Sequence, residues 1–104
     1  MEPDPKLRNP SIEVFKDAEY WLGRGHQVSA GTTTELQLSI DYYLHGIRAN
    51  PRHVACVYNV ACAFYALGKF HNSLKWFSHA IKLQNTNKDS YFNKALSHFR
   101  LAEY

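Results

Sequence analysis

The chain has 104 residues, 45% of them hydrophobic and 20% charged, which suits one small globular domain and leaves no room for a second. The formal net charge of +3 comes from Lys and Arg residues spread along the chain, without a basic run, so composition does not indicate a nucleic-acid-binding protein. No stretch approaches the roughly 18 apolar residues that span a bilayer, and the opening M-E-P-D-P lacks the apolar part of a secretory signal. We therefore expect the protein to be located in the cytoplasm, which is a reducing compartment, and not to associate with a membrane.

The N-terminal region divides into an arm and a first helix. Residues 1–9 combine prolines with mixed charges and are predicted to be an extended arm. A helix is predicted over 10–22, because Asn9 can cap it and Pro10 suits the first helical position. Gly23 is expected to end this helix.

A long loop and a second helix come next. The segment 23–34 contains three glycines and little apolar material, so we expect a loop. Thr32 followed by Glu35 has the form of a capping box, which predicts a second helix over 33–49. The residues expected to face inward from this helix are Leu36, Ile40, Tyr43, Leu44 and Ile47.

Three further helices are predicted over 51–67, 70–83 and 88–104. Gly68 marks the turn between the first two of them, and the polar segment 84–87 separates the last two. No segment shows the strict alternation that a strand needs, so the expected class is all-α with five helices.

The cysteines and histidines do not indicate catalysis or metal binding. Cys56 and Cys62 are six residues apart in one predicted helix, on different faces, so we expect two reduced cysteines that serve in packing. No pair of the six histidines has the i, i+4 spacing of a helical zinc site, and no phosphate loop or catalytic constellation is present. We therefore predict that the chain is not an enzyme and that it binds no metal ion or cofactor.

The sequence repeats itself at a fixed offset of ~34 residues. Ser39 and Ser73 are one of the pairs of matching residues that this offset joins. The other residues of similar type that this repeat offset pairs include Tyr43 with Phe77, His45 with His79, Ala61 with Ala95, and Leu67 with Leu101. A pair of helices that repeats every ~34 residues is typical of a stacked solenoid, in which no single unit covers its own apolar face.

The unit 54–87 resembles a tetratricopeptide repeat (TPR). The residues that carry the resemblance are Ala61, Phe64, Gly68, Phe70, Ser73, Phe77 and Ala80. Val57 stands where the family often has Trp, Val60 and Ala61 where it has Leu-Gly, and Ser73 replaces a usual Ala. The resemblance implies a right-handed α-solenoid of antiparallel helix pairs, with about two TPR-like units and a C-terminal single helix.

The resemblance also divides the TPR-like domain, 10–104, into units. The segment 10–53 would be an atypical first unit with an insertion at 23–34 between its helices, and 54–87 a complete unit. The segment 88–104 is then either the first helix of a third unit, in a fragment of a longer array, or a capping helix.

A capping helix needs a polar outer face. The residues available for it are Lys88, Asp89, Asn93, Lys94, Ser97, His98 and Arg100. Tyr91, Phe92 and Phe99 are more apolar than a solvated cap requires, so both alternatives stay open.

In proteins that this chain resembles, the first helices of successive units line a concave groove that holds a peptide. Asn59 and Asn93 occupy equivalent repeat positions and would face this groove, where a carboxamide can bind a peptide backbone. The predicted groove residues are Tyr58, Asn59, Cys62, Tyr65, Asp89, Phe92, Asn93 and Phe99. The alternative for the two asparagines is hydrogen bonding within the fold.

The expected function is therefore that of a non-catalytic protein–protein interaction module that binds a partner's peptide or helix. A second hypothesis is a structural segment of a larger scaffold, packing through its ends and self-associating or continuing through the C-terminal helix. A third is RNA binding by a mildly basic face, formed by Arg48, Arg52, Lys69, Lys75 and Lys82.

Overall fold

The computed structural model describes residues 16–28 and 31–103. This part of the chain forms five helices and no strand, which confirms the all-α class. They are α3 (Ala18–Gln27), α4 (Thr33–Ala49), α5 (Val54–Ala66), α6 (Phe70–Leu83) and α7 (Lys88–Ala102). None of these described helices is both long and apolar enough to cross a membrane.

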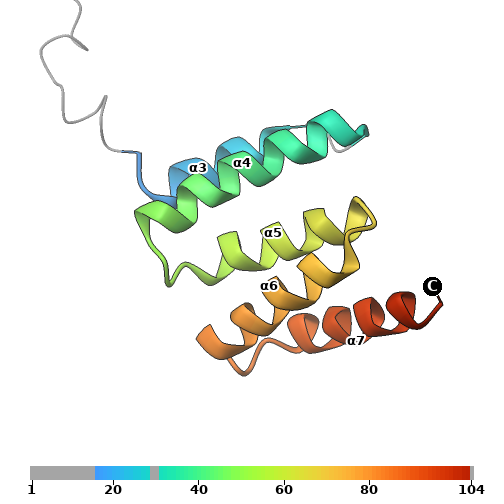
Figure 1. Ribbon diagram of the computed structural model, residues 1–104. Helices are drawn as coiled ribbons and strands as arrows, with labels where there is room; N and C mark the ends of the chain where they lie inside the picture. Colours follow the sequence, from blue (N-terminus) through green and yellow to red (C-terminus); the bar gives the residue numbers. More distant parts are fainter. Residues whose placement is uncertain (1–15, 29–30, 104) are drawn as a thin grey trace, which may run out of the picture.

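The helices are stacked in chain order, from α3 and α4 at the top of Figure 1 to α7 at the bottom. Each helix packs against the one before it and the one after it. In addition, α5 contacts both α3 and α7, whereas α4 and α6 make no close backbone contact with each other. Helices α3, α5 and α7 are thus neighbours along one side of the stack.

Local capping sets the helix boundaries that the sequence predicts well. The capping box of α4 is present: the Thr32 hydroxyl accepts from the Glu35 N–H at 3.1 Å, and the Glu35 carboxylate accepts from the Thr32 N–H at 3.0 Å. The side chain of Asn87 caps α7 in the same way by accepting from the N–H of Ser90. Gly68 provides the positive φ, 79°, with which the chain leaves α5 for α6.

The predicted end of the first helix at Gly23 is wrong. Helix α3 begins after its N-cap Asp17 and continues through Gly23 and Gly25 to Gln27. The beginning of the predicted loop at 23–34 is therefore helical. The predicted helix start at Pro10 and the predicted arm at 1–9 lie outside the described residues.

The reason for the longer helix lies in the packing of Gly25. It is buried against Tyr43 of α4, and a Cβ at this position would lie 2.3 Å from a ring carbon of Tyr43. Glycine here permits close approach of two helices and does not stop a helix.

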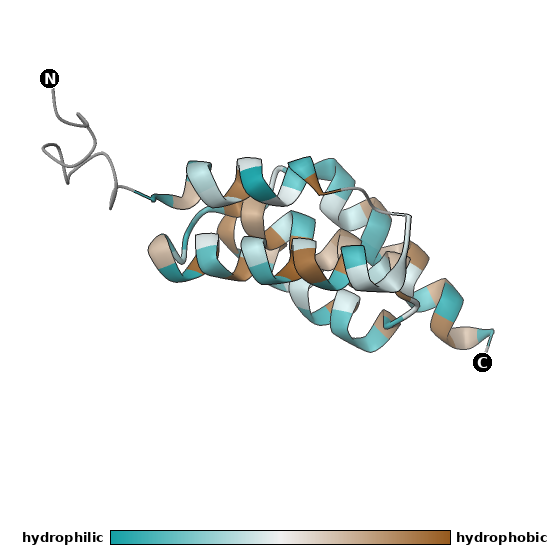
Figure 2. Cartoon of the chain, turned by 90° about the horizontal axis from the view of Figure 1, so that it is seen from above, coloured by the Kyte–Doolittle hydropathy of each residue, from teal (hydrophilic) through white to brown (hydrophobic). Residues whose placement is uncertain are grey.

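The core runs along α5 and the faces of α4 and α6 that cover it. The residues with at most 1% of their surface exposed include Ile40, Cys56, Val57, Val60, Ala61, Phe77 and Ala80. In Figure 2, hydrophobic positions alternate with hydrophilic ones along the helices at the front, as one-sided burial requires. Of the inward positions predicted for the second helix, Ile40 and Tyr43 are buried, and Leu36, Leu44 and Ile47 are half-buried.

Small residues fill the helix crossings. Gly46 in α4 and Ala80 in α6 occupy equivalent positions of the repeat. At the crossing of α4 with α5, a Cβ on Gly46 would lie 2.5 Å from the sulfur of Cys56. Between α6 and α7 the crossing is made by serines: the hydroxyls of Ser73 and Ser97 lie 2.9 Å apart, and neither residue is exposed. Their small size lets two helices approach closely while each hydroxyl keeps a hydrogen-bonding partner.

The predicted polar outer face of the last helix is wrong at Ser97. This residue faces α6, and its hydroxyl also donates to the carbonyl of Asn93 at 3.0 Å. The uncovered side of α7 presents the rings of Phe92 and Phe99 instead, which are 64% and 62% exposed. A sequence pattern counts a serine as a polar, outward-facing residue. The small side chain of Ser97 instead suits the contact between α6 and α7.

Candidate functional site

A polar cluster joins α5 to α7 around the hydroxyl of Tyr58. The amide nitrogen of Asn93 donates to this hydroxyl at 2.9 Å and also to the carbonyl oxygen of Asp89 at 2.9 Å. The Tyr58 hydroxyl also interacts with the thiol of Cys62, one helical turn further along α5, and each group affects the pKa of the other. Four of the predicted groove residues therefore lie together.

Partial burial raises the pKa of two groups in this cluster, the Tyr58 hydroxyl and the Cys62 thiol. Burial, followed by the neighbouring Cys62 and Asp89, raises the pKa of the Tyr58 hydroxyl to about 12, against the opposing hydrogen bond from Asn93. Burial also raises the pKa of the Cys62 thiol, although its bond with Tyr58 acts in the other direction. At neutral pH both groups are hydrogen-bonding groups, because the reactive thiolate form of Cys62 is disfavoured.

A hollow of about 330 Å³ adjoins this cluster, between the end of α3, α4 and α5. The residues that line it are Gly25, His26, Val28, Leu36, Ser39, Tyr43, Asn59, Cys62, Ala63 and Ala66. Cys62 lies in this lining and also interacts with Tyr58, so it connects the hollow to the polar cluster. The half-buried surface thus extends from α3 across α5 to α7.

The two equivalent asparagines use part of their hydrogen-bonding capacity inside the fold. Asn59 donates to the carbonyl of Ala55 at 2.7 Å, and Asn93 donates to the carbonyl of Asp89, in each case four residues back. The second donor of Asn93 is used by Tyr58, which leaves only its oxygen as an acceptor. Asn59 has one N–H and its oxygen without a hydrogen-bonding partner among the described residues.

The remaining predicted groove residues are not part of this cluster. Tyr65 packs edge-on against Phe70 at the start of α6, with ring centroids 5.1 Å apart. Phe92 and Phe99 are seven residues apart on α7 and therefore share its exposed side. Of the eight predicted residues, the structure thus brings together Tyr58, Cys62, Asp89 and Asn93, and it does not join Tyr65, Phe92 and Phe99 to them.

The sequence reasoning missed the contribution of α3 to the hollow. Gly25 and His26 line it, although the sequence predicts a loop at these positions. The repeat offset could have indicated this contribution, because it pairs Gly25 of α3 with Asn59 of α5, and both residues line the hollow. Ser39, matched with Ser73 by the same offset, bonds to the carbonyl of Gly25 at 3.3 Å.

Within the described residues, no three side chains of His, Cys, Asp or Glu are grouped so that they could hold a metal ion. Both cysteines are free, as their spacing predicts. Comparison of the chain with protein-family models and with curated proteins gives no match.

Proposed function

We propose that this chain is a non-catalytic protein–protein interaction module, built as a TPR-like α-solenoid of about two helix pairs and a single helix. It holds a partner's peptide or helix in a groove to which α3, α5 and α7 contribute. The packing of each helix on its neighbours, with α3, α5 and α7 adjacent along one side, supports this arrangement.

The observation that carries the proposal is the half-buried strip from the hollow beside Asn59, through Cys62 and Tyr58, to Asn93. It combines apolar walls with a few polar groups that retain unused capacity: the N–H and oxygen of Asn59, and the oxygen of Asn93. A peptide backbone, which alternates donors and acceptors, matches such a strip.

The test uses peptides selected from a random displayed library for binding to the full chain. The variant Asn59→Ala, Tyr65→Phe, Asn93→Ala removes the polar groups and keeps the ring that packs on Phe70. We expect the affinity for the selected peptides to fall by about tenfold or more, since two to three ligand hydrogen bonds are lost.

The matched control replaces asparagines outside the strip, with Asn72→Ala and Asn85→Ala, both at exposed positions. Circular dichroism checks that each variant is folded. Unchanged peptide affinity in the folded triple variant contradicts the proposed groove.

A second readout locates the bound peptide. Cys56 is fully buried whereas Cys62 is half-buried, so a thiol reagent reacts first with Cys62 in the native protein. A peptide in the strip should slow this reaction by the fraction of protein that is occupied. An unchanged labelling rate at saturating peptide places the peptide elsewhere.

The second candidate function is that of a structural segment that packs through its end. The exposed aromatic rings on α7, Tyr91, Phe92 and Phe99, favour it, because isolated domains rarely leave such a stripe open to water. Sedimentation over a range of concentrations tests it. Self-association that Phe92→Ser and Phe99→Ser abolish, and that Leu38→Ser on α4 does not, supports this candidate; a monomer at all concentrations argues against self-association.

A further inference from the structure

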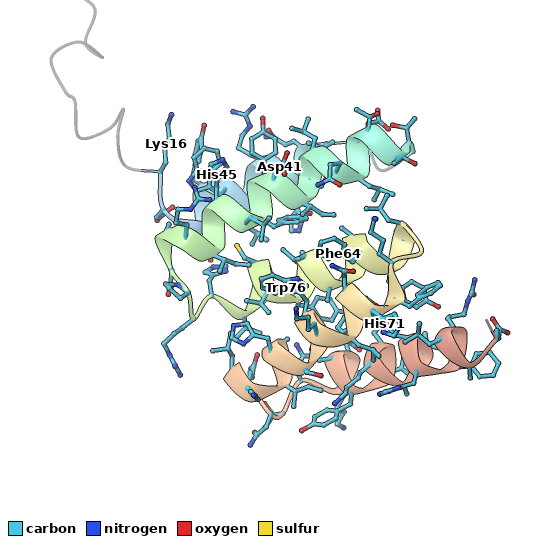
Figure 3. The ribbon with its side chains drawn as sticks, viewed as in Figure 1. Lys16, Asp41, His45, Phe64, His71 and Trp76 are labelled. Atoms are coloured by element: carbon cyan, nitrogen blue, oxygen red, sulfur yellow. The ribbon has the colours of Figure 1, made fainter. Side chains whose placement is uncertain are left out.

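A second hollow, of about 530 Å³, lies between α6 and α7, away from the strip of polar groups on α5. The residues that line it are His71, Leu74, Lys75, Ser78, His79, Lys82, Lys94 and His98. Figure 3 shows His71 on the side of α6 that faces α7. Most of these lining residues are lysines or histidines.

The basic residues converge because of their spacing on two helices. His71, Lys75, His79 and Lys82 follow one another at steps of four, four and three, so they form one stripe along α6. Lys94 and His98, four residues apart, form the facing stripe on α7. The crossing of α6 and α7 brings the two stripes to one hollow.

No negative charge balances this hollow. Its lining contains no carboxylate, and α6 has no Asp or Glu at all. In the described part of the chain, no carboxylate forms an ion pair with Lys75, Lys82 or Lys94. Three ammonium groups that share one concave surface repel one another, so an anion that enters it gains from all three.

The donors favour phosphate as the anion. An ammonium group offers three N–H donors, and each imidazole offers at least one, while a phosphate group presents several acceptor oxygens with high charge. Three positive charges match a diphosphate or triphosphate better than a single carboxylate. The volume is within the range of small-molecule sites, whereas an RNA would need a longer basic track.

An apolar hollow of about 300 Å³ adjoins the basic one across the ridge formed by Lys75 and His79, which line both. Its other walls are Ile47, Pro51 and Trp76. The indole of Trp76 is therefore placed to meet the organic part of a ligand whose phosphate groups lie among the lysines.

We propose that the hollow between α6 and α7 is a binding site for small polyphosphate anions, held by Lys75, Lys82 and Lys94 with donors from the three histidines. This site is separate from the proposed peptide groove and goes beyond it. The shared chemistry is a chain of two or more phosphate groups, which inorganic polyphosphate and nucleotides both supply.

The test titrates the full chain with sodium tripolyphosphate and, separately, with ADP, by calorimetry. In a Trp21→Phe background Trp76 is the single tryptophan, so its fluorescence reports on the adjoining hollow. We expect saturable binding of tripolyphosphate that weakens as ionic strength rises from about 0.01 M to about 0.15 M. A fluorescence change with ADP that tripolyphosphate does not produce identifies a nucleotide as the fitting source, and equal responses identify inorganic polyphosphate.

The decisive variants are Lys82→Gln and Lys94→Gln, one from each helix. Together they should weaken tripolyphosphate binding about tenfold or more, since two charge-assisted contacts are lost. The control, Arg48→Gln with Arg52→Gln, removes the same total charge from exposed positions outside the lining and should change affinity less than about threefold.

Three results would overturn the proposal. They are the absence of saturable tripolyphosphate binding up to about 1 mM, equal losses in the lysine and arginine variants, and binding that only a long RNA shows. The second and third of these assign the effect to general surface charge. Circular dichroism of each variant ensures that a loss of binding is not a loss of fold.

Discussion

The Gly46→Ala substitution tests whether the crossing of α4 and α5 depends on a missing side chain. The expected Cβ would lie 2.5 Å from the sulfur of Cys56, 3.4 Å from the carbonyl oxygen of Ala18 and 3.4 Å from the Cβ of Trp21. Attractive contacts between heavy atoms begin at about 3.5 Å, so the sulfur must move by about 1 Å. Cys56 is fully buried and has little space into which it can move.

Two opposing effects determine the magnitude. Replacing glycine by alanine inside a helix adds about 1 kcal/mol of stability. Overpacking a closed core costs about 1–3 kcal/mol. The clash is with an internal atom and not with a flexible surface chain, so we expect a net loss of about 1 kcal/mol, within the range of about 0–2 kcal/mol that the two effects allow.

The matched control is Gly23→Ala. Gly23 lies inside α3, and a Cβ there would have nothing within 4 Å. It should gain about 0.5–1 kcal/mol from the same change in helix propensity. The two substitutions are chemically identical, so the difference between them isolates the packing at Gly46.

The assay is urea unfolding followed by circular dichroism, completed to a double-mutant cycle with Cys56→Ala. Removing the sulfur should recover much of the loss, with a coupling energy of about 1–2 kcal/mol between the two positions. The reasoning is refuted if Gly46→Ala stabilises the protein as much as Gly23→Ala does. Additivity within about 0.3 kcal/mol in the cycle would refute it as well.

Three further outcomes are expected. Ser73→Ala or Ser97→Ala alone should cost about 1 kcal/mol, but the double variant should cost less than the sum, because the bond between the two hydroxyls, which either single change removes, is lost only once; strict additivity in urea unfolding contradicts the pairing. Burial, aided by Glu19, raises the pKa of Cys56 to about 11 from the ordinary 9.0, so the neutral thiol is favoured in the fold. Its stabilising effect is complete below pH 9.0 and is lost as pH rises towards 11; stability measured from pH 8 to pH 11 should fall less steeply in Cys56→Ala, and equal slopes contradict this assignment. Thr32→Ala should cost about 1 kcal/mol by removing the cap of α4, measured as a lower midpoint in thermal unfolding, and Thr33→Ala beside it should leave the midpoint nearly unchanged.

The sequence predicts those elements whose ends are set by local chemistry. The Thr32–Glu35 capping box defines the start of α4, and Gly68 marks the turn after α5; both signals involve residues close in the chain. The same logic fails for α3. A single sequence does not distinguish a glycine that ends a helix from a glycine that leaves space for a neighbouring ring. The position of Tyr43 shows that Gly25 leaves space for a ring.

The candidate site shows the same division. The repeat offset anticipates that Tyr58, Cys62 and Asn93 lie on facing helices, because it aligns α5 with α7. It does not show which donors are already used, since the bond from Asn93 to Tyr58 depends on side-chain geometry across the crossing. The basic hollow also escapes prediction, because the pattern of α7 alone puts Lys94 and His98 on an outer face and does not reveal the neighbouring α6.

The central place of α5 has a consequence for motion. It contacts each of the other four described helices, whereas α3 and α7 lie at the two ends of the stack. Where each element is supported mainly by its neighbours, opening proceeds from the ends inward. Backbone amides of α5 should therefore exchange with deuterium most slowly and those of α3 and α7 fastest. The strip of polar groups would then be most rigid at Tyr58 and Cys62 on α5 and more mobile where it reaches α3 and α7.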